Sequence, residues 1–170
     1  MPEQRVRIEQ LDQPTIAALA AGDLDAARRL TDVPLTPWLA SDACRRTWQY
    51  RVQQLLDTPG DQPWVTGVVL DERDGNVVGQ AGFHGAPDET GMVEVGYKIH
   101  PDLRRRGYAR ATLQVLLDRA RREPEVRVLR ATISPDNEAS LGLVASFGLL
   151  RNGEQWDEED GLEWIFEIDA

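Results

Sequence analysis

The sequence contains few of the residues that build disulfides, metal centres or membrane spans. Cys44 is its only cysteine, which excludes an intramolecular disulfide, a cysteine-rich zinc site and an iron–sulfur cluster. No stretch approaches the roughly 20 consecutive apolar residues of a membrane-spanning helix. The N-terminal residues have no apolar segment behind them, so no signal peptide is expected. We therefore expect a soluble protein of the reducing cytoplasm, without a metal centre.

Lysine is also nearly absent, and negative charge is in excess. Lys98 is the only lysine, and 29 acidic against 19 basic side chains give a formal net charge of −10. This charge argues against non-specific binding to nucleic acid or to anionic membranes. The 170 residues suit a single domain, residues 1–170, whose core needs no disulfide or metal.

Hydrophobic periodicity predicts helices first, then a meander of strands, then alternating strands and helices. Two short helices separated at Gly22 are expected within 17–30, and an N-cap at Ser41 starts a helix over 42–57. An Asp-Gly step between strands 64–70 and 76–83 predicts a β-hairpin. The other expected elements are strands at 5–11, 92–100, 127–134 and 162–168, and helices at 110–122 and 137–147. This order indicates a mixed α/β sheet in one domain.

The most informative segment is the junction between strand 92–100 and helix 110–122. Its residues 104–109 are Arg-Arg-Arg-Gly-Tyr-Ala. The first turn of a helix leaves N–H groups unpaired, and the helix dipole places partial positive charge there. Because Gly107 and Ala109 are small, a phosphate can approach this backbone closely. The alternative is an ordinary turn in which Gly107 supplies a positive φ.

The distribution of charge supports a small polyanionic ligand at this junction. Residues 100–130 contain nine arginines and four acidic residues, whereas residues 152–170 contain eight acidic and no basic residues. A basic region within an acidic protein suits a small polyanion better than DNA. The alternative is that these arginines are solvated on the helix or paired with the acidic C-terminal segment. Neither the P-loop pattern nor the G-x-G-x-x-G fingerprint occurs, which disfavours phosphoryl transfer and dinucleotide binding.

These residues resemble the GNAT superfamily of acetyl-CoA-dependent N-acetyltransferases. Segment 104–109 matches its pattern of Arg or Gln, two residues, Gly, one residue, and Gly or Ala. Segment 134–140 is similar to the family's P-x-N-x-x-S segment, and 147–149 to its closing region. Residues 94–97 ahead of 100–101 resemble the ribosomal-protein N-terminal (RimJ/RimL-type) branch. The resemblance implies an α/β (α+β) GNAT fold, in which helices flank a mixed, mostly antiparallel central sheet.

The resemblance also implies where acetyl-CoA binds. In the family the pantetheine arm lies along the fourth strand and pairs with its backbone, here Tyr97, Lys98 and Ile99. Asn137 matches an asparagine that hydrogen-bonds the pantetheine, and its alternative role is a helix N-cap. The pyrophosphate binds the loop and the start of the following helix, here Arg104, Arg105, Arg106, Gly107, Tyr108, Ala109 and Arg110.

Acetyl transfer to an amine requires a base, donors for the oxyanion and a proton for the leaving thiolate. The resemblance implies Glu94 as the base, directly or through water, and the alternative is a solvent-facing strand glutamate. Backbone amides of the fourth strand are candidate oxyanion donors. Ser140 or water is the candidate acid, because Val144 stands where several relatives have an acidic tyrosine. His84, in the segment Phe83-His84-Gly85, is a further candidate at the mouth of the same cleft, but a loop histidine with no visible partner is more often incidental.

The resemblance therefore implies transfer of an acetyl group from acetyl-CoA to a primary amine by direct attack within a ternary complex. The acceptor is a protein N-terminus or a small-molecule amine. The alternative is a non-catalytic acyl-CoA-binding sensor or regulatory protein, which Val144 keeps open. The expected partners are acetyl-CoA and the amine, with no nucleic acid and no membrane, and the resemblance leaves open a homodimer.

Overall fold

The structure is a computed structural model that describes residues 3–170, and it contains two compact units. The first unit contains the chain up to Ala86 together with Gly96–Val115, and the second contains Pro87–Val95 together with Leu116–Ala170. Strand β4 (Met92–Ile99) and helix α4 (Tyr108–Arg122) each contribute residues to both units. None of the helices within residues 3–170 is both long and apolar enough to cross a membrane.

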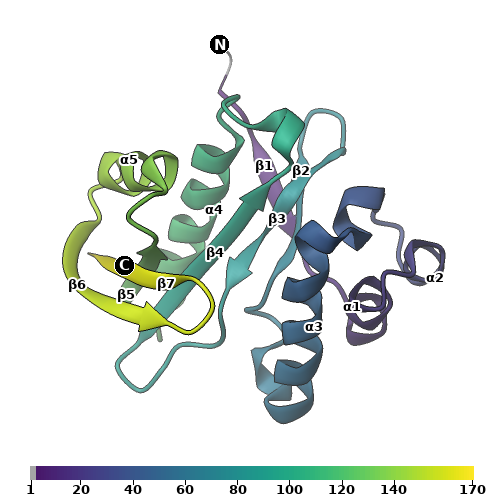
Figure 1. The fold of residues 1–170 in the computed structure, drawn as a ribbon, viewed down its shortest axis with the longest axis horizontal. Coiled ribbons are helices and arrows are strands. Elements are labelled where there is room, and N and C mark those ends of the chain that lie inside the picture. Colours follow the sequence, from purple (N-terminus) through teal and green to yellow (C-terminus); the bar gives the residue numbers. More distant parts are fainter. Residues whose placement is uncertain (1–2) are drawn as a thin grey trace. The chain divides into compact units, whose positions relative to one another are not determined.

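Seven strands pair through backbone hydrogen bonds (Figure 1). Besides β4 they are β1 (Val6–Glu9), β2 (Gly67–Asp71), β3 (Val77–Phe83), β5 (Val128–Ile133), β6 (Leu150–Asp157) and β7 (Gly161–Asp169). Their order is β1-β2-β3-β4-β5-β7-β6. The β4–β5 pair is parallel, whereas β1–β2, β2–β3, β5–β7 and β6–β7 are antiparallel. The predicted mixed, mostly antiparallel sheet is confirmed.

The core of the first unit lies between its helices and strands. The helices are α1 (Gln13–Ala20), α2 (Leu24–Leu30) and α3 (Asp42–Asp57). The Nε1 of fully buried Trp48 on α3 donates a hydrogen bond to the Leu39 carbonyl at 2.8 Å. Apolar side chains from these helices pack with those of β2 and β3, and the core includes Ile16, Leu19, Leu55, Val65, Val68 and Leu70. Burial of this apolar face is the main force that holds the helices on the strands.

The hairpin between β2 and β3 forms as the Asp-Gly step predicts. Gly75 adopts φ +73°, and the Asp71 N–H donates to the Asn76 carbonyl at 2.9 Å across the turn. The prediction differs from the structure in one respect, since it treats Asp71 as a turn residue. Asp71 is the last residue of β2 and is only 2% exposed.

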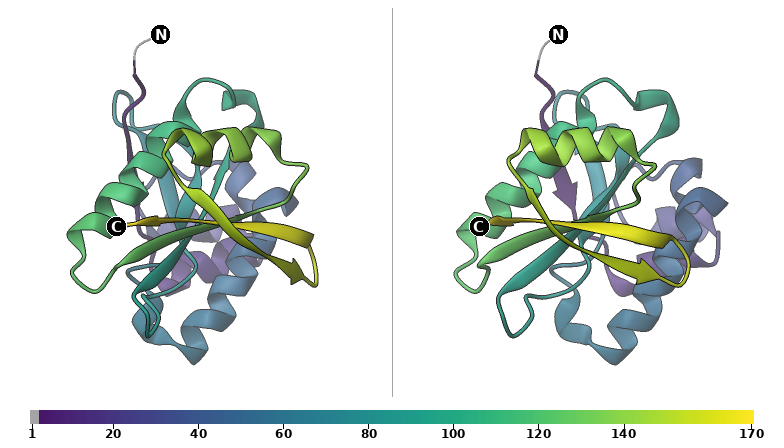
Figure 2. Two further views of the ribbon diagram at one scale, coloured as in Figure 1. Left: turned by 90° about the vertical axis from the view of Figure 1, so that its left-hand side faces the viewer. Right: turned by 60° about the vertical axis from the view of Figure 1, so that its left-hand side comes forward.

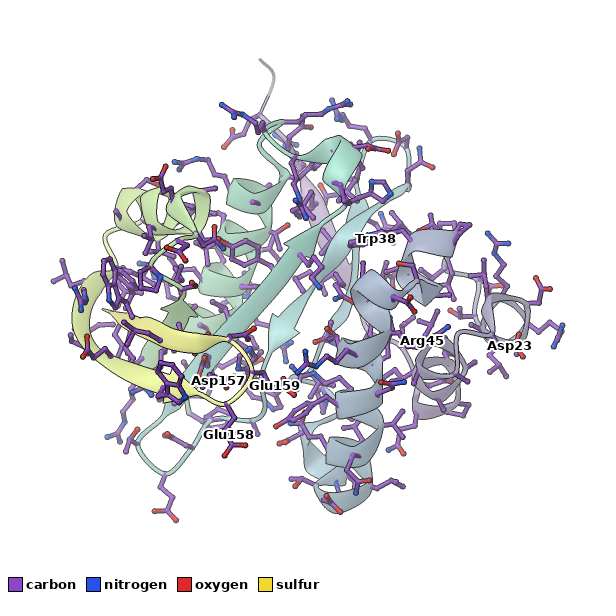
Figure 3. The ribbon with its side chains drawn as sticks, viewed as in Figure 1. Asp23, Trp38, Arg45, Asp157, Glu158 and Glu159 are labelled. Atoms are coloured by element: carbon purple, nitrogen blue, oxygen red, sulfur yellow. The ribbon has the colours of Figure 1, made fainter. Side chains whose placement is uncertain are left out.

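The second unit is built around β5. Helix α5 (Glu138–Ser146) follows β5 and contributes the fully buried Val144. The Arg130 guanidinium on β5 forms an ion pair with Glu167 on β7 at 2.6 Å. Strands β6 and β7 form a long antiparallel hairpin that ends the chain (Figure 2). Asp157, Glu158 and Glu159 lie together at its turn (Figure 3), where Asp157 Oδ1 accepts hydrogen bonds from two backbone N–H groups.

Two element predictions need correction. The sequence does not predict strand β6, because six of its eight residues are exposed and the alternation of apolar and polar residues that marks a half-buried strand is missing. Helix α1 begins at Gln13 instead of residue 17. The Oδ1 of Asp12 accepts a hydrogen bond from the Thr15 N–H at 2.9 Å, and this N-cap together with Pro14 in the first turn moves the start forward.

Candidate functional site

Strand β4 leads into helix α4 through a loop with two unusual backbone conformations. A 3-10 turn, η3 (Pro101–Leu103), comes first. Gly107 then has φ +91°, which the ordinary-turn alternative also predicts, and Arg105 has φ +59°, the one positive φ of a non-glycine residue within 3–170. Such conformations are uncommon outside glycine and concentrate at functional sites. The loop is therefore held in a shape that an ordinary turn does not require.

The basic side chains of this loop reach the surface. Arg104, Arg105, Arg106 and, in the first turn of α4, Arg110 are all exposed. The Nε of Arg104 donates to the Ile99 carbonyl at 3.3 Å, which turns that side chain back toward the end of β4. Exposed guanidinium groups next to the first-turn amides of a helix can donate hydrogen bonds to phosphate oxygens.

A buried carboxylate connects the hairpin of β2 and β3 to the start of α4. Asp71 accepts hydrogen bonds from Arg73, whose Nε lies 3.1 Å from Oδ1 and whose Nη2 lies 2.7 Å from Oδ2. The Tyr108 hydroxyl donates to the same Oδ2 at 2.7 Å. The hydrogen bonds from Arg73 hold the pKa of Asp71 well below its usual range. Burial, and then the hydrogen bond to Asp71, raises the pKa of Tyr108.

The N-terminal segment extends this network to the loop backbone. The Oε1 of Gln4 accepts from Arg73 Nη2 at 2.6 Å, and its Nε2 donates to the Arg106 carbonyl at 3.0 Å. A cavity of about 480 Å³ lies beside these contacts and is lined in part by Arg5, Arg106 and Arg110. The Tyr108 hydroxyl is thus hydrogen-bonded to Asp71, and the Arg106 carbonyl is hydrogen-bonded to Gln4. We call the set of Gln4, Asp71, Arg73 and Tyr108 the loop clasp.

The predicted pantetheine-binding stretch of β4 is partly covered. Ile99 is buried, whereas Tyr97 and Lys98 are half-buried. The Nζ of Lys98 donates to the Ala43 carbonyl at 2.6 Å, so its ammonium group is used at the start of α3. A Cβ placed on Gly79 of β3 would overlap the Lys98 carbonyl. Close approach of β3 to this part of β4 therefore depends on glycine.

Glu94 lies on the part of β4 that belongs to the second unit. Its Oε1 accepts a hydrogen bond from the Thr132 hydroxyl of β5 at 2.5 Å, and the residue is half-buried. In the parallel register it lies opposite Arg130, whose guanidinium is paired with Glu167. The carboxylate is thus more constrained than the solvent-facing alternative implies.

Asn137 is the N-cap of α5, which confirms the structural role weighed for it. Its Oδ1 accepts a hydrogen bond from the Ser140 N–H at 3.1 Å. A ligand would have to use the other end of the same carboxamide. Ser140 is half-buried in the first turn, and Val144 is fully buried in the core. The position of the relatives' acidic tyrosine is therefore filled by a core side chain.

Sequence reasoning misses three members of the loop clasp. It assigns Asp71 and Arg73 to a hairpin turn, and Gln4 to no element. The pairs Gln4–Arg73 and Asp71–Tyr108 are 69 and 37 residues apart in sequence. The one available signal is the position of Asp71 directly after a run of buried apolar residues, where an acidic side chain needs a partner.

Cys44 lies in the core, where its environment does not favour a nucleophilic thiolate. Its side chain is fully buried on α3, and this burial raises the pKa of the thiol to about 11. A nucleophilic cysteine must be a thiolate, so the protonated thiol of Cys44 is unreactive near neutral pH.

We expect Cys44 to resist a disulfide reagent such as dithionitrobenzoate in the folded protein and to react fully after unfolding, because only unfolding exposes the thiol. Absorbance at the wavelength of the released thiolate measures this. The Cys44→Ala variant should release none in either state. Rapid stoichiometric reaction of the native protein would contradict the burial.

Comparison with known sequences finds acetyltransferases both among family models and among individual proteins. The family model of the acetyltransferase (GNAT) domain matches residues 5–149. YjdG of Bacillus subtilis (strain 168), an uncharacterized N-acetyltransferase, is 26% identical over 162 residues, which are 95% of this chain and 94% of that protein. An uncharacterized N-acetyltransferase of Bacillus licheniformis, p20, is 27% identical over 101 residues, 59% of this chain and 56% of that one.

Comparison with solved structures shows the same fold. RimJ of Mycobacterium smegmatis in complex with CoA-disulfide has a TM-score of 0.67 at 18% identity, with 98% of this chain and 85% of that chain covered. The ribosomal-protein-S5-alanine acetyltransferase of Vibrio fischeri has a TM-score of 0.66 at 16% identity, with 99% and 95% covered. A spermidine N-acetyltransferase chimera from Vibrio cholerae SpeG and hSSAT has a TM-score of 0.65 at 13% identity, with 97% and 95% covered.

Proposed function

Because the chain belongs to the acetyltransferase (GNAT) domain family and is an acetyl-CoA-dependent acetyltransferase, we propose that it acetylates a primary amine by direct attack within a ternary complex. The acceptor is a protein N-terminus or a small-molecule amine. The observation that carries the proposal is the loop at 104–107, which holds positive φ at Arg105 and Gly107. The loop clasp supports this shape without help from a ligand.

The acetyl-CoA contacts are proposed from the matched family positions. The pyrophosphate binds the amides at the start of α4 and the arginines at 104–106 and 110, where charge-assisted hydrogen bonds favour phosphate. The pantetheine arm binds the backbone of 97–99. Asn137 would contribute the amino group of its carboxamide, since its oxygen caps α5.

The chemistry requires that an ammonium group lose a proton before its nitrogen attacks the thioester carbonyl, because a free amine has an ordinary pKa of about 10. Glu94 is proposed as a base for the acceptor amine, directly or through water, and His84 is the second candidate. Backbone N–H groups of β4 are the proposed donors to the oxyanion. Ser140 or water is proposed to protonate the leaving thiolate.

The acceptor is proposed to be cationic before reaction. The net charge of −10 favours approach of an ammonium group, and Asp88 and Glu89 add exposed negative charge between β3 and β4. Structures with the same fold include a spermidine acetyltransferase and ribosomal-protein acetyltransferases by their names. Both kinds of acceptor are primary amines, which supports the amine class without selecting one member.

Four broader proposals accompany this function. The two units together form one acetyltransferase domain, which is supported by a family match that spans residues from both. Membership of the RimJ/RimL-like branch is supported by the sequence at 94–97. A cytoplasmic location is supported by the single cysteine, which needs no oxidising compartment. A homodimer is proposed because dimers are common in the family.

A second candidate function is a non-catalytic acyl-CoA sensor on the same fold. One observation favours it, namely that Val144 is 0% exposed and replaces the tyrosine that several relatives use as acid. A sensor would bind acetyl-CoA as tightly as an enzyme and release no thiol when amines are added.

We expect acetyl-CoA at about 100 times its Kd to raise the unfolding free energy by about 2.7 kcal/mol, because a ligand that binds only the folded chain stabilises it by mass action. Thermal unfolding with acetyl-CoA and with CoA measures this. A panel of small amines and peptides with free N-termini should then produce amine-dependent thiol release. Absence of any stabilisation would refute the cofactor site, and stabilisation without release on the whole panel would favour the sensor.

A further inference from the structure

His84 directly follows β3, and its imidazole lies against Gly96 of β4. A Cβ placed on Gly96 would lie 2.9 Å from His84 Nε2 and 3.4 Å from Cδ2. The ring therefore occupies the space that a side chain at position 96 would take. His84 itself is exposed. The geometry places a titratable nitrogen over the backbone of β4, one residue before the proposed pantetheine-binding stretch 97–99.

The backbone of His84 is fixed by side chains of helix α3. The His84 carbonyl accepts hydrogen bonds from Gln54 Nε2 at 2.7 Å and from Arg51 Nη1 at 3.3 Å. Gln54 Nε2 also donates to Asp61 Oδ2 at 2.7 Å. The Ala86 N–H donates to Asp61 Oδ1 at 3.1 Å. The segment 84–86 is thus held at two points of its backbone.

Arg51 makes this arrangement unusual. Its side chain is only 6% exposed, its Nε donates to the Thr66 hydroxyl at 3.1 Å, and burial lowers its pKa. Burying a guanidinium group is unfavourable unless its donors are satisfied. Arg51 Nη1 donates to Gln54 Oε1 at 2.5 Å and reaches the His84 carbonyl at 3.3 Å, at a surface segment that would ordinarily be left to solvent. These contacts fix the backbone from which the His84 side chain extends.

We propose that His84 is the base that takes the proton from the acceptor ammonium. This inference rests on the proposed acetylation of an amine and names the group that performs its first step. Histidine has an ordinary pKa of about 6.5, which suits a general base near neutral pH.

The step balances in protons and bonds. The imidazole takes one proton from the ammonium group and later releases it to solvent. The freed nitrogen lone pair forms a C–N bond with the acetyl carbonyl as the C–S bond breaks. The nitrogen loses its second proton, which ends on the CoA sulfur. The products are the N-acetylated amine, CoA thiol and one proton in solution.

Two charged side chains of the same unit, Arg51 and Asp61, hold the segment that carries His84. Arg51 from α3 donates to the His84 carbonyl, and Asp61 accepts from Gln54 and from the Ala86 N–H. On the part of β4 that belongs to the same unit, Lys98 Nζ donates to the Ala43 carbonyl. A titration in the rate profile near neutral pH is therefore expected to follow the imidazole.

The test compares His84→Gln with His100→Gln, which replaces the only other histidine. We expect His84→Gln to lower kcat about 100-fold, leave the KM for acetyl-CoA unchanged and remove the fall of kcat at acidic pH. The His84→Ala variant should recover part of its rate with added imidazole. His100→Gln should keep the profile of the parent protein. Gly96→Ala, which displaces the ring, should lower kcat without abolishing acetyl-CoA binding.

Two results would overturn the inference about His84 and leave the proposed function intact. One is a His84→Gln variant with unchanged kcat, and the other is an acidic limb that persists in His84→Gln but disappears in Glu94→Gln. If the parent protein binds acetyl-CoA yet releases no thiol with any amine, the proposed function fails, and the inference fails with it. Because the first two results require an active parent protein, the two failures are distinguishable.

Discussion

Replacing Asp71 by asparagine is expected to lower the unfolding free energy by about 2 kcal/mol and to weaken acetyl-CoA binding about tenfold. The carboxamide would retain the shape of the side chain but lose the charge that receives hydrogen bonds from Arg73 and Tyr108. Since Arg73 is half exposed, its unpaired charge is hydrated, which keeps the loss below that of a fully buried pair. Urea unfolding and calorimetric titration with acetyl-CoA measure the two effects.

The stability effect has a defined dependence on pH. The pKa of Asp71 lies well below its usual range because Arg73 donates hydrogen bonds to it, so the folded protein holds this carboxylate charged where the unfolded chain takes up a proton. The contribution is complete above the ordinary aspartate pKa of about 3.9. It decreases as pH falls below that value, because protons then favour the unfolded chain. The difference between parent and Asp71→Asn should therefore be constant near neutrality and shrink in acid.

Asp74→Asn is the matched control. Asp74 lies in the same turn and is exposed, and its side chain accepts a hydrogen bond from the Asn76 N–H at 2.9 Å. We expect a change below about 1 kcal/mol and unaltered acetyl-CoA affinity. An Asp71→Asn variant that loses stability but binds acetyl-CoA normally would show that the loop at 104–107 does not depend on the clasp.

The sequence is sufficient for the elements whose residues interact locally. The hairpin follows from Asp74-Gly75 because a residue with positive φ is needed there. The α5 cap follows from Asn137, whose side chain reaches an N–H three residues away. Strand β6 lacks this kind of signal, since its residues are exposed on both faces and only pairing with β7 fixes them.

The same division between local and long-range contacts applies to the candidate site. The anion-binding junction follows from glycine and arginine next to a helix start, which is a local property. The loop clasp and the support of His84 depend on contacts such as Gln4–Arg73 and Gln54–His84, which are 69 and 30 positions apart, and no periodicity marks them. A buried polar side chain such as Arg51 or Asp71 becomes informative only when the groups around it are known.

Replacing Gly107 by valine is expected to weaken acetyl-CoA binding about 100-fold, or by about 2.7 kcal/mol. At φ +91° a β-branched side chain is strained, and relief of the strain would move the amides of the first turn of α4. The added methyl groups would also occupy the space through which a phosphate approaches the backbone. The nearest atom to a Cβ placed here is Gln4 Cγ at 3.4 Å, so the fold itself has room for the change.

Gly75→Val separates strain from binding in this prediction. Gly75 has a comparable φ of +73°, and no atom lies within 4 Å of a Cβ placed on it. Both variants should lose about 1–2 kcal/mol of stability from the left-handed conformation, while only Gly107→Val should lose affinity for acetyl-CoA. If both bound acetyl-CoA equally well, the backbone at Gly107 would not be the phosphate-binding element. If Gly107→Val lost affinity for CoA and acetyl-CoA alike, the defect would lie in the part that the two molecules share, as contact with the pyrophosphate requires.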